Sequence, residues 1–272
     1  MKVTFQTALI TGSSRGIGRS IAIKLAQEGV ENIGVHSHSN RDEAEKTLAL
    51  IRQAGADGAL IQGDTSNVDE AEDIVKAAAQ QLGGCDIFVQ SVVPRMEKIY
   101  EHVSATEVPL DKWQLAFDTQ ARAFFVGARA AAKSMTKGGR IIALSYTMGA
   151  QTGSWQPWVG MGPAKAALDS MCKYFAVDLG RQGITVNSVS PGVSDPSTIT
   201  GQIPPAVQAA MQDWIESGWT PMRRIGSAED TANVCALLCT DEAGFLTGQT
   251  ISVDGGSSLM NPQFPLAVQI PA

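Results

Sequence analysis

A glycine-rich turn near the start of the chain has the residue types of a phosphate-binding site. The apolar run Ala8-Leu9-Ile10 is typical of a buried strand, and apolar residues recur at helical spacing after the turn. Free backbone N–H groups and the positive dipole end of that helix would favour a pyrophosphate there. We expect the turn to contribute these nucleotide-binding residues: Gly12, Ser14, Arg15, Gly16, Ile17 and Gly18. The alternative is a glycine-rich connection without a ligand.

The elements that must position this turn alternate along the chain, as in a parallel sheet. After the first strand, strands are predicted at Ile33–Val35, Ala59–Ile61, Ile87–Val89, Arg140–Leu144, Thr185–Val189 and Thr250–Val253. Helices are predicted at 17–26, Asp42–Ala54, Asp69–Leu82, about Leu110–Met135, Pro163–Arg181 and Ala228–Leu238. We therefore expect an α/β fold: a single-domain, doubly wound parallel sheet (Rossmann fold) of about seven strands with helices on both faces.

Polar or glycine residues follow the predicted strands, and the carboxyl ends of parallel strands meet at one edge of the sheet. Ligands of open α/β sheets bind at that edge. The residues expected there are Gly12, His36, Ser37, Asp64, Thr65, Ser91, Ser145, Pro191, Gly192 and Val193.

Composition narrows the class of protein. The 272 residues carry a net charge of −6, which disfavours nucleic acid and anionic membranes as partners. No apolar run approaches the roughly 18 residues that a transmembrane helix needs. The four cysteines and three histidines lack metal-ligand spacing, so no metal site is predicted and a cytoplasmic protein is expected.

The spacing G-x-x-x-G-x-G after Thr11 resembles the short-chain dehydrogenase/reductase family. Between residues 4 and 258, further motifs resemble its enoyl-thioester (enoyl-ACP and cyclohexenylcarbonyl-CoA) reductase branch. These motifs are Leu144-Ser145-Tyr146, Met161-Gly162-Pro163-Ala164-Lys165, Thr220-Pro221-Met222-Arg223-Arg224 and Val253-Asp254-Gly255-Gly256. The resemblance implies NAD(P)H-dependent reduction, with Asp64 and Thr65 near the adenine and Lys165 near the nicotinamide ribose.

The chain departs from the family at the position of the active-site tyrosine. The family motif Y-x-x-x-K aligns on Lys165, but Met161 stands four residues before it. The enoyl reductase branch has a tyrosine seven residues before the lysine, and here that residue is Trp158. Gln120 stands where the family has an asparagine, and Gln90-Ser91-Val92-Val93 replaces Asn-Asn-Ala-Gly.

Three residues remain as candidate catalytic groups: Ser145, Tyr146 and Lys165. Hydride transfer leaves a developing oxyanion that needs a hydrogen-bond donor, which either hydroxyl could supply. Both side chains can reach one site only if the strand ends at Leu144, because adjacent residues of a strand face opposite ways. The alternatives are a serine that bonds local backbone and a tyrosine ring packed beside the strand.

The cofactor is predicted to be NADP(H) rather than NAD(H). A carboxylate at the end of the second strand would bond the ribose 2′-hydroxyl of NAD, and none is present there. Arg15, Arg41 and the small donors His36 and Ser37 suit a 2′-phosphate instead. Alternatively, Arg41 is simply solvated.

The remaining predictions concern domains and function. Residues 1–258 are expected to form a dinucleotide-binding domain that resembles the short-chain dehydrogenase/reductase family and includes a substrate lid at about 194–220, with a C-terminal tail at 259–272. Alternating apolar residues from Phe264 to Ile270 predict an extended arm. Trp155, Trp158, Trp214 and Trp219 are candidates for an apolar substrate pocket.

The resemblance implies a homotetramer. Three functions stay open: an enoyl-thioester or conjugated-carbonyl reductase, a ketoreductase, and a dinucleotide-binding protein without turnover.

Overall fold

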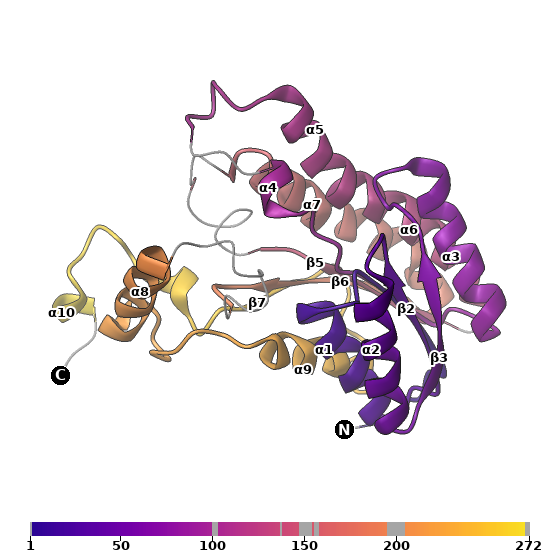
Figure 1. The fold of residues 1–272 in the computed structure, drawn as a ribbon. Coiled ribbons are helices and arrows are strands. Elements are labelled where there is room, and N and C mark those ends of the chain that lie inside the picture. The colour runs from indigo at the N-terminus through magenta and orange to yellow at the C-terminus, as the bar shows by residue number, and fades with distance from the viewer. Residues whose placement is uncertain are drawn as a thin grey trace.

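The chain folds around one parallel sheet. The computed structural model describes residues 2–99, 103–136, 138–146, 154, 158–194 and 205–269. Within them the sheet has seven strands in the order β3-β2-β1-β4-β5-β6-β7 (Figure 1). The strands are β1 (Thr7–Thr11), β2 (Asn32–Ser37), β3 (Asp57–Gln62), β4 (Ile87–Gln90), β5 (Gly139–Leu144), β6 (Ile184–Pro191) and β7 (Thr250–Val253). The predicted doubly wound sheet is confirmed.

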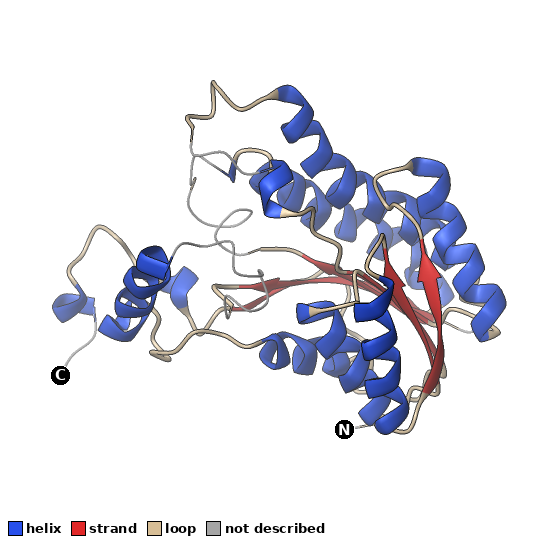
Figure 2. Cartoon of the chain, in the orientation of Figure 1, coloured by secondary structure: helices blue, strands red, loops and turns tan. Residues whose placement is uncertain are grey.

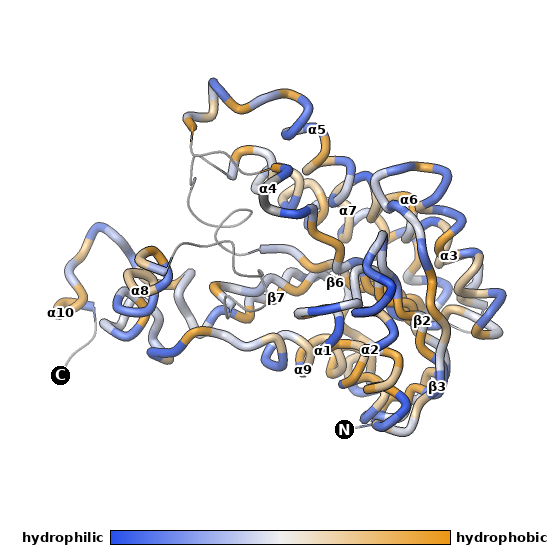
Figure 3. The backbone as a smooth tube through the Cα atoms, in the orientation of Figure 1, coloured by the Kyte–Doolittle hydropathy of each residue, from blue (hydrophilic) through white to orange (hydrophobic). Residues whose placement is uncertain are grey.

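Helices cover both faces of the sheet (Figure 2). One face carries α1 (Gly16–Gln27), α2 (Arg41–Gln53) and α9 (Ala228–Leu238). The other carries α3 (Val68–Leu82), α6 (Ala123–Ala132) and α7 (Met161–Leu179). Each layer has its own apolar core, because both faces of the strands are buried. Figure 3 shows hydrophobic segments running through the central strands and the helices that pack on them.

The long helix after β4 is one continuous run with an irregular middle. It consists of α5 (Leu110–Phe117), a π-helical segment (Asp118–Arg122) and α6, and it ends at Ala132. The predicted end at about Met135 is therefore too late by about a turn. π-Helical segments occur often at functional sites. Here the segment packs against α7, which carries Lys165.

The loop after β4 and the C-terminal region differ from the prediction. The loop contains a short helix, α4 (Met96–Ile99), and part of the expected lid forms α8 (Pro205–Trp214) with a helical extension to Trp219. The predicted extended arm is wrong, because Leu266–Gln269 form a helical turn, α10. Gln269 closes this turn by accepting from Asn261 N at 2.8 Å and donating to Phe264 O at 2.6 Å. Residues 195–204 and Ile270 lie outside the described residues.

None of the helices described is long and apolar enough to cross a membrane.

Gly18 allows α1 to pack closely on the turn that precedes it. A Cβ at this position would lie 2.5 Å from Gly12 O and 3.0 Å from Ser13 Cα. Both neighbours are backbone atoms, so Gly18→Ala must displace the helix or the turn. We expect the free energy of unfolding to fall by about 1–3 kcal/mol, the usual cost of overpacking. Denaturant titration measures it, with Gly180→Ala as the control because nothing lies within 4 Å of a Cβ there. Equal midpoints for the two variants would contradict this account.

Candidate active site

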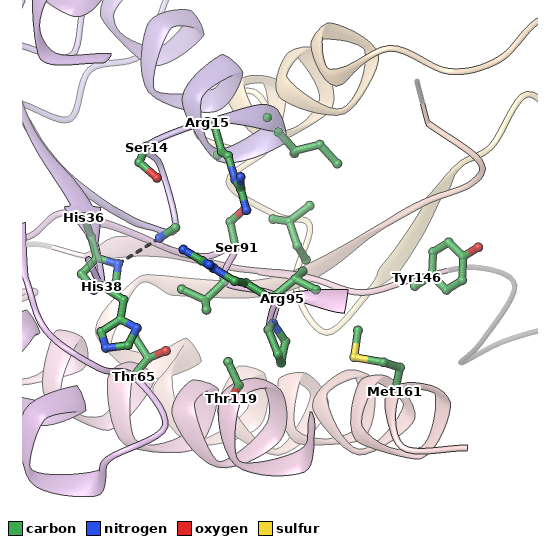
Figure 4. Close-up of a pocket in the computed structure, with 18 of the residues that line it drawn as sticks. Ser14, Arg15, His36, His38, Thr65, Ser91, Arg95, Thr119, Tyr146 and Met161 are labelled. Atoms are coloured by element: carbon green, nitrogen blue, oxygen red, sulfur yellow. Dashed lines mark hydrogen bonds between the residues drawn. The ribbon is translucent and has the colours of Figure 1, made fainter. Parts of the chain in front are cut away.

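A pocket of about 560 Å³ lies at the carboxyl ends of the strands (Figure 4). The strand order reverses between β1 and β4, and residues that follow both strands line the pocket. This is the switch point at which open α/β sheets bind ligands. Most of the residues predicted from sequence for the site line this one pocket: Gly12, Ser14, Arg15, Gly16, Ile17, Gly18, His36, Ser37, Asp64, Thr65, Ser91, Ser145, Tyr146, Lys165, Pro191, Gly192 and Val193.

The glycine turn presents the amino end of α1 to this pocket. The helix begins at Gly16, and its N-cap residue Arg15 makes no side-chain cap hydrogen bond. Gly12 and Gly16 have φ values of 67° and 57°, which favour glycine over other residues. The first-turn N–H groups of a helix without such a cap suit a phosphate. The turn therefore fits the pyrophosphate of a dinucleotide.

His36 braces the glycine turn from the end of β2. Gly12 N donates to His36 Nδ1 at 3.0 Å, which places the ring proton on Nε2, 3.1 Å from Gly63 O. The peptide N–H of His36 donates to Ser13 Oγ at 2.9 Å. Burial lowers the pKa of His36 to about 4, although the hydrogen bond to Gly63 opposes that shift. The imidazole is thus neutral, with both nitrogens engaged in holding the turns after β1 and β3.

One end of the pocket gathers cationic side chains around Asp64. Burial raises the pKa of Asp64, but hydrogen bonds from Ser66 outweigh this and the net shift is downward. His38 Nε2 lies 4.0 Å from Asp64 Oδ2, and the charge of Lys98 also lowers the pKa of Asp64. In Figure 4, Arg15 and Arg95 extend toward the same space beside Ser91. This end therefore suits the phosphates and base of an adenosine group.

The structure changes which arginines belong to this end. Arg41 does not line the pocket, because it is exposed and its Nε donates to Glu45 at 2.8 Å on the next turn of α2. Arg95 and Lys98, which sequence reasoning missed, do line it. Two cations five and eight residues after the end of β4 were the available signal. The short helix α4, which begins directly after Arg95 and contains Lys98, was not predicted.

The opposite end of the pocket brings the three candidate catalytic residues together. β5 ends at Leu144, which confirms the condition under which Ser145 and Tyr146 can share one site. Lys165, buried in α7, donates from Nζ to Leu144 O. Burial lowers the pKa of Lys165 to about 7, and the nearby charge of Asp169 opposes that shift. Ser145 Oγ donates to Asp169 Oδ2 at 2.8 Å.

Aromatic and apolar side chains form the wall beside Tyr146. Its ring meets Trp158 edge-on, with centroids 6.2 Å apart. Burial raises the pKa of Tyr146, which keeps the phenol protonated, while a hydrogen bond with Trp158 works in the other direction. Met161 packs with Ile99 and Ala116 in a small apolar cluster. The position of the family tyrosine thus contributes to an apolar wall.

The other tryptophans do not all share this location. Trp214 and Trp219 stack on each other, with centroids 4.9 Å apart, and neither lines the pocket. Trp155 lies outside the described residues. Only Trp158, of the three tryptophans with described positions in these segments, therefore meets the expectation of a pocket-lining ring.

Two glutamines occupy positions where the family has asparagines. Gln90 accepts from Thr11 Oγ1 at 2.9 Å and donates to Thr119 O at 3.3 Å, so it joins β1, β4 and the π-helical segment. Gln120 is fully buried, and its amide oxygen and nitrogen have no hydrogen-bond partner among the described residues. Gln90 therefore links three elements through hydrogen bonds, whereas Gln120 has no such bond to the described residues.

Fold and pocket together define a doubly wound α/β protein of the Rossmann type, with its site at the switch point. A family model described as Enoyl-(Acyl carrier protein) reductase matches residues 12–258. The 1-cyclohexenylcarbonyl-CoA reductase of Streptomyces collinus is 34% identical over 259 residues, covering 95% of this chain and 89% of the relative. The 3-oxoacyl-(acyl-carrier-protein) reductase of Staphylococcus aureus is 34% identical over 260 residues, covering 94% and 99%.

A solved short-chain dehydrogenase/reductase from Serratia marcescens superposes with a TM-score of 0.83 at 30% identity, covering 93% of this chain and 98% of that one. The chain belongs to the short-chain dehydrogenase/reductase family. Its relatives are reductases, which makes the family one of oxidoreductases.

Proposed function

We propose that the protein is an NADP(H)-dependent reductase of an enoyl thioester or a related conjugated carbonyl compound. The observation that carries this proposal is the convergence of Ser145, Tyr146 and Lys165 on the pocket that begins at the glycine turn. The names of the family model and of the Streptomyces collinus relative support the substrate class. The wall formed by Trp158 and Met161 suits an apolar acyl group.

The chain's own residues have distinct tasks in this reaction. A reduced nicotinamide, when bound, supplies the hydride. The α1 end and Arg15 would hold the phosphates, and Lys165 would hold the ribose hydroxyls. Tyr146, which the pocket keeps protonated, would donate a hydrogen bond to the oxygen on which negative charge develops. The hydroxyl proton of Ser145 is directed at Asp169, so the serine is better placed to accept a hydrogen bond than to donate one.

The test is a substrate panel with the purified protein, in which consumption of reduced nicotinamide is followed by absorbance. The panel contains enoyl-CoA and enoyl-pantetheine thioesters, simple enones and β-keto thioesters. We expect faster turnover of the conjugated C=C compounds with NADPH. Preference for the keto thioesters would identify a ketoreductase, the second candidate, which the 34% identity to the Staphylococcus aureus relative favours. Nucleotide binding without turnover of any compound would reject both and leave the dinucleotide-binding function.

Two arginine variants, Arg15→Ala and its control Arg41→Ala, test the cofactor preference. NADPH is expected to bind at least several-fold tighter than NADH, because Arg15 lies in the pocket and can pair with a 2′-phosphate. Arg15→Ala should narrow this ratio in a fluorescence titration. Arg41→Ala, which removes an arginine held by Glu45 outside the pocket, should leave it unchanged. Equal affinities of the wild-type protein for the two nucleotides would reject the NADP(H) proposal.

We further propose that the protein assembles as a homotetramer. Tyr174 and Val177 lie on α7 with exposed fractions of 78% and 83%, and Phe245 is fully exposed. Tyr174 and Val177 are three residues apart and so share one face of α7, which supports a subunit contact through this helix.

A further inference from the structure

A buried polar cluster lies directly behind the catalytic end of the pocket. Asp169 follows Lys165 by one helical turn, so both side chains lie on the same face of α7. Asp169 accepts from Ser145 Oγ at 2.8 Å, whereas the hydroxyl of Ser188 on β6 donates to Thr250 Oγ1 at 2.9 Å. Burial raises the pKa of Asp169, and the bond from Ser145 and the charge of Lys165 oppose that shift. The second oxygen of Asp169, Oδ1, is buried without a hydrogen-bond partner among the described residues. Asp169 itself does not line the pocket.

Lys165 depends on this carboxylate for its charge. The lysine is 3% exposed, and a buried ammonium group loses its proton unless an opposite charge lies near it. Burial lowers the pKa of Lys165 to about 7, and within the described residues the charge of Asp169 opposes that shift. Neither Asp118 nor Arg122 of the π-helical segment packed against α7 does so.

The remaining titratable groups around the cluster lie near its edges. Tyr146 follows β5, and Cys172 and Lys173 lie further along α7, where each interacts with Asp169 rather than with Lys165. Ser188 of β6, which also lies near the carboxylate, does not titrate. The protonation of Lys165 is therefore coupled first to Asp169.

We propose that Asp169 is a positioning residue that favours the ammonium form of Lys165 and binds the hydroxyl proton of Ser145, acting through both on the reaction proposed above. The carboxylate of Asp169 thus determines the roles of Lys165 and Ser145. Lys165 keeps the charge that holds a nucleotide, and Ser145 presents lone pairs to the pocket. Tyr146 is left as the donor. This inference rests on the proposed function for its catalytic meaning, whereas the coupling of Asp169 to Lys165 is a property of the free protein.

The test measures the pKa of Lys165 directly in the protein without nucleotide. Trace acetylation with acetic anhydride modifies only the neutral amine, and mass spectrometry of the peptide that carries Lys165 quantifies it across a pH series. Asp169→Asn keeps the shape and removes the charge, so the pKa of Lys165 should fall by about one unit, since a nearby charge shifts a pKa by one or more units. Acetylation below that pKa would then rise about tenfold. Asp169→Glu should restore labelling close to that of the wild type.

Asp178→Asn is the matched control, because it removes the same charge from an exposed position of the same helix. Its labelling should equal that of the wild type. If Asp169→Asn does not fold by circular dichroism, the smaller neutral variant Asp169→Ser takes its place. Unchanged labelling of Lys165 in a folded neutral variant would overturn the inference.

The kinetic arm separates this inference from the proposed function. With an active substrate, the alkaline limb of kcat/KM should move to lower pH in Asp169→Asn and stay in place in Asp178→Asn. A purely structural role of Asp169 would lower activity without moving that limb. Failure of the wild-type protein to reduce any compound would reject the reductase proposal, and the acetylation result would still decide the coupling.

Discussion

Tyr146→Phe is expected to lower kcat about 100-fold or more while NADPH affinity stays nearly unchanged. A hydrogen-bond donor to a developing oxyanion acts mainly in the transition state, and general acids contribute about 10²–10⁴-fold. Neither Met161 nor Trp158 offers a replaceable acidic proton, since a thioether has no proton to donate and an indole N–H gives only a hydrogen bond. Steady-state kinetics and a fluorescence titration of NADPH measure the two quantities.

The matched control is Tyr174→Phe, which removes the same hydroxyl outside the pocket and keeps the ring that the proposed subunit contact on α7 uses. Its kcat should equal that of the wild type. Full activity of Tyr146→Phe together with loss of activity in Ser145→Ala would make the serine or a water the donor. The tyrosine assignment would then be wrong.

Acidification is expected to remove about 2–3 kcal/mol of the free energy of unfolding through His36 alone. The folded-state pKa is about 4, whereas an unfolded histidine has a pKa of about 6.5. The unfolded chain therefore binds a proton between these pH values and the folded chain does not, so stability falls as pH falls through this window. Above about pH 6.5 the contribution is complete, and below about pH 4 the loss ends.

Denaturant titrations at about pH 7.5 and 4.5 measure this change, and the difference between variants isolates it from other titrating groups. His36→Asn keeps an acceptor near Gly12 and cannot titrate, so its stability should fall less on acidification by about the same 2–3 kcal/mol. His38→Asn removes a histidine that is 63% exposed, and because burial is a larger cause of the His36 shift than the charge of His38, most of the acid loss should remain in this variant. An identical acid loss in wild type and His36→Asn would show that His36 is not the group responsible.

The helices and strands could be predicted from sequence only in part. The boundaries of β7 and α9 agree with the expectation from sequence, and β5 begins one residue earlier than expected, because apolar runs and capping residues mark these elements. The arm was mispredicted, because the alternation from Phe264 onward is too short to outweigh Pro265 and the hydrogen bonds of Gln269. The expected lid was also predicted only in part, because its helix α8 has no buried side chain that would mark it in the sequence.

What the sequence by itself determined is the doubly wound fold and the residues at its binding edge. Period and glycine spacing are local properties, and a parallel sheet carries every βα turn to the same edge. Gly12, His36, Ser91 and Lys165 could therefore be assigned to one pocket before any contact was known.

Only the tertiary structure decided what each side chain at that edge does. In the folded protein Arg41 pairs with Glu45, and Arg95 and Lys98 line the pocket. Both ring nitrogens of His36 form hydrogen bonds with backbone groups. It also placed Asp169 against Ser145. Hydrogen-bond partners and burial arise between segments far apart in the chain. They set the charge of Lys165 and the neutrality of His36, which no local pattern contains.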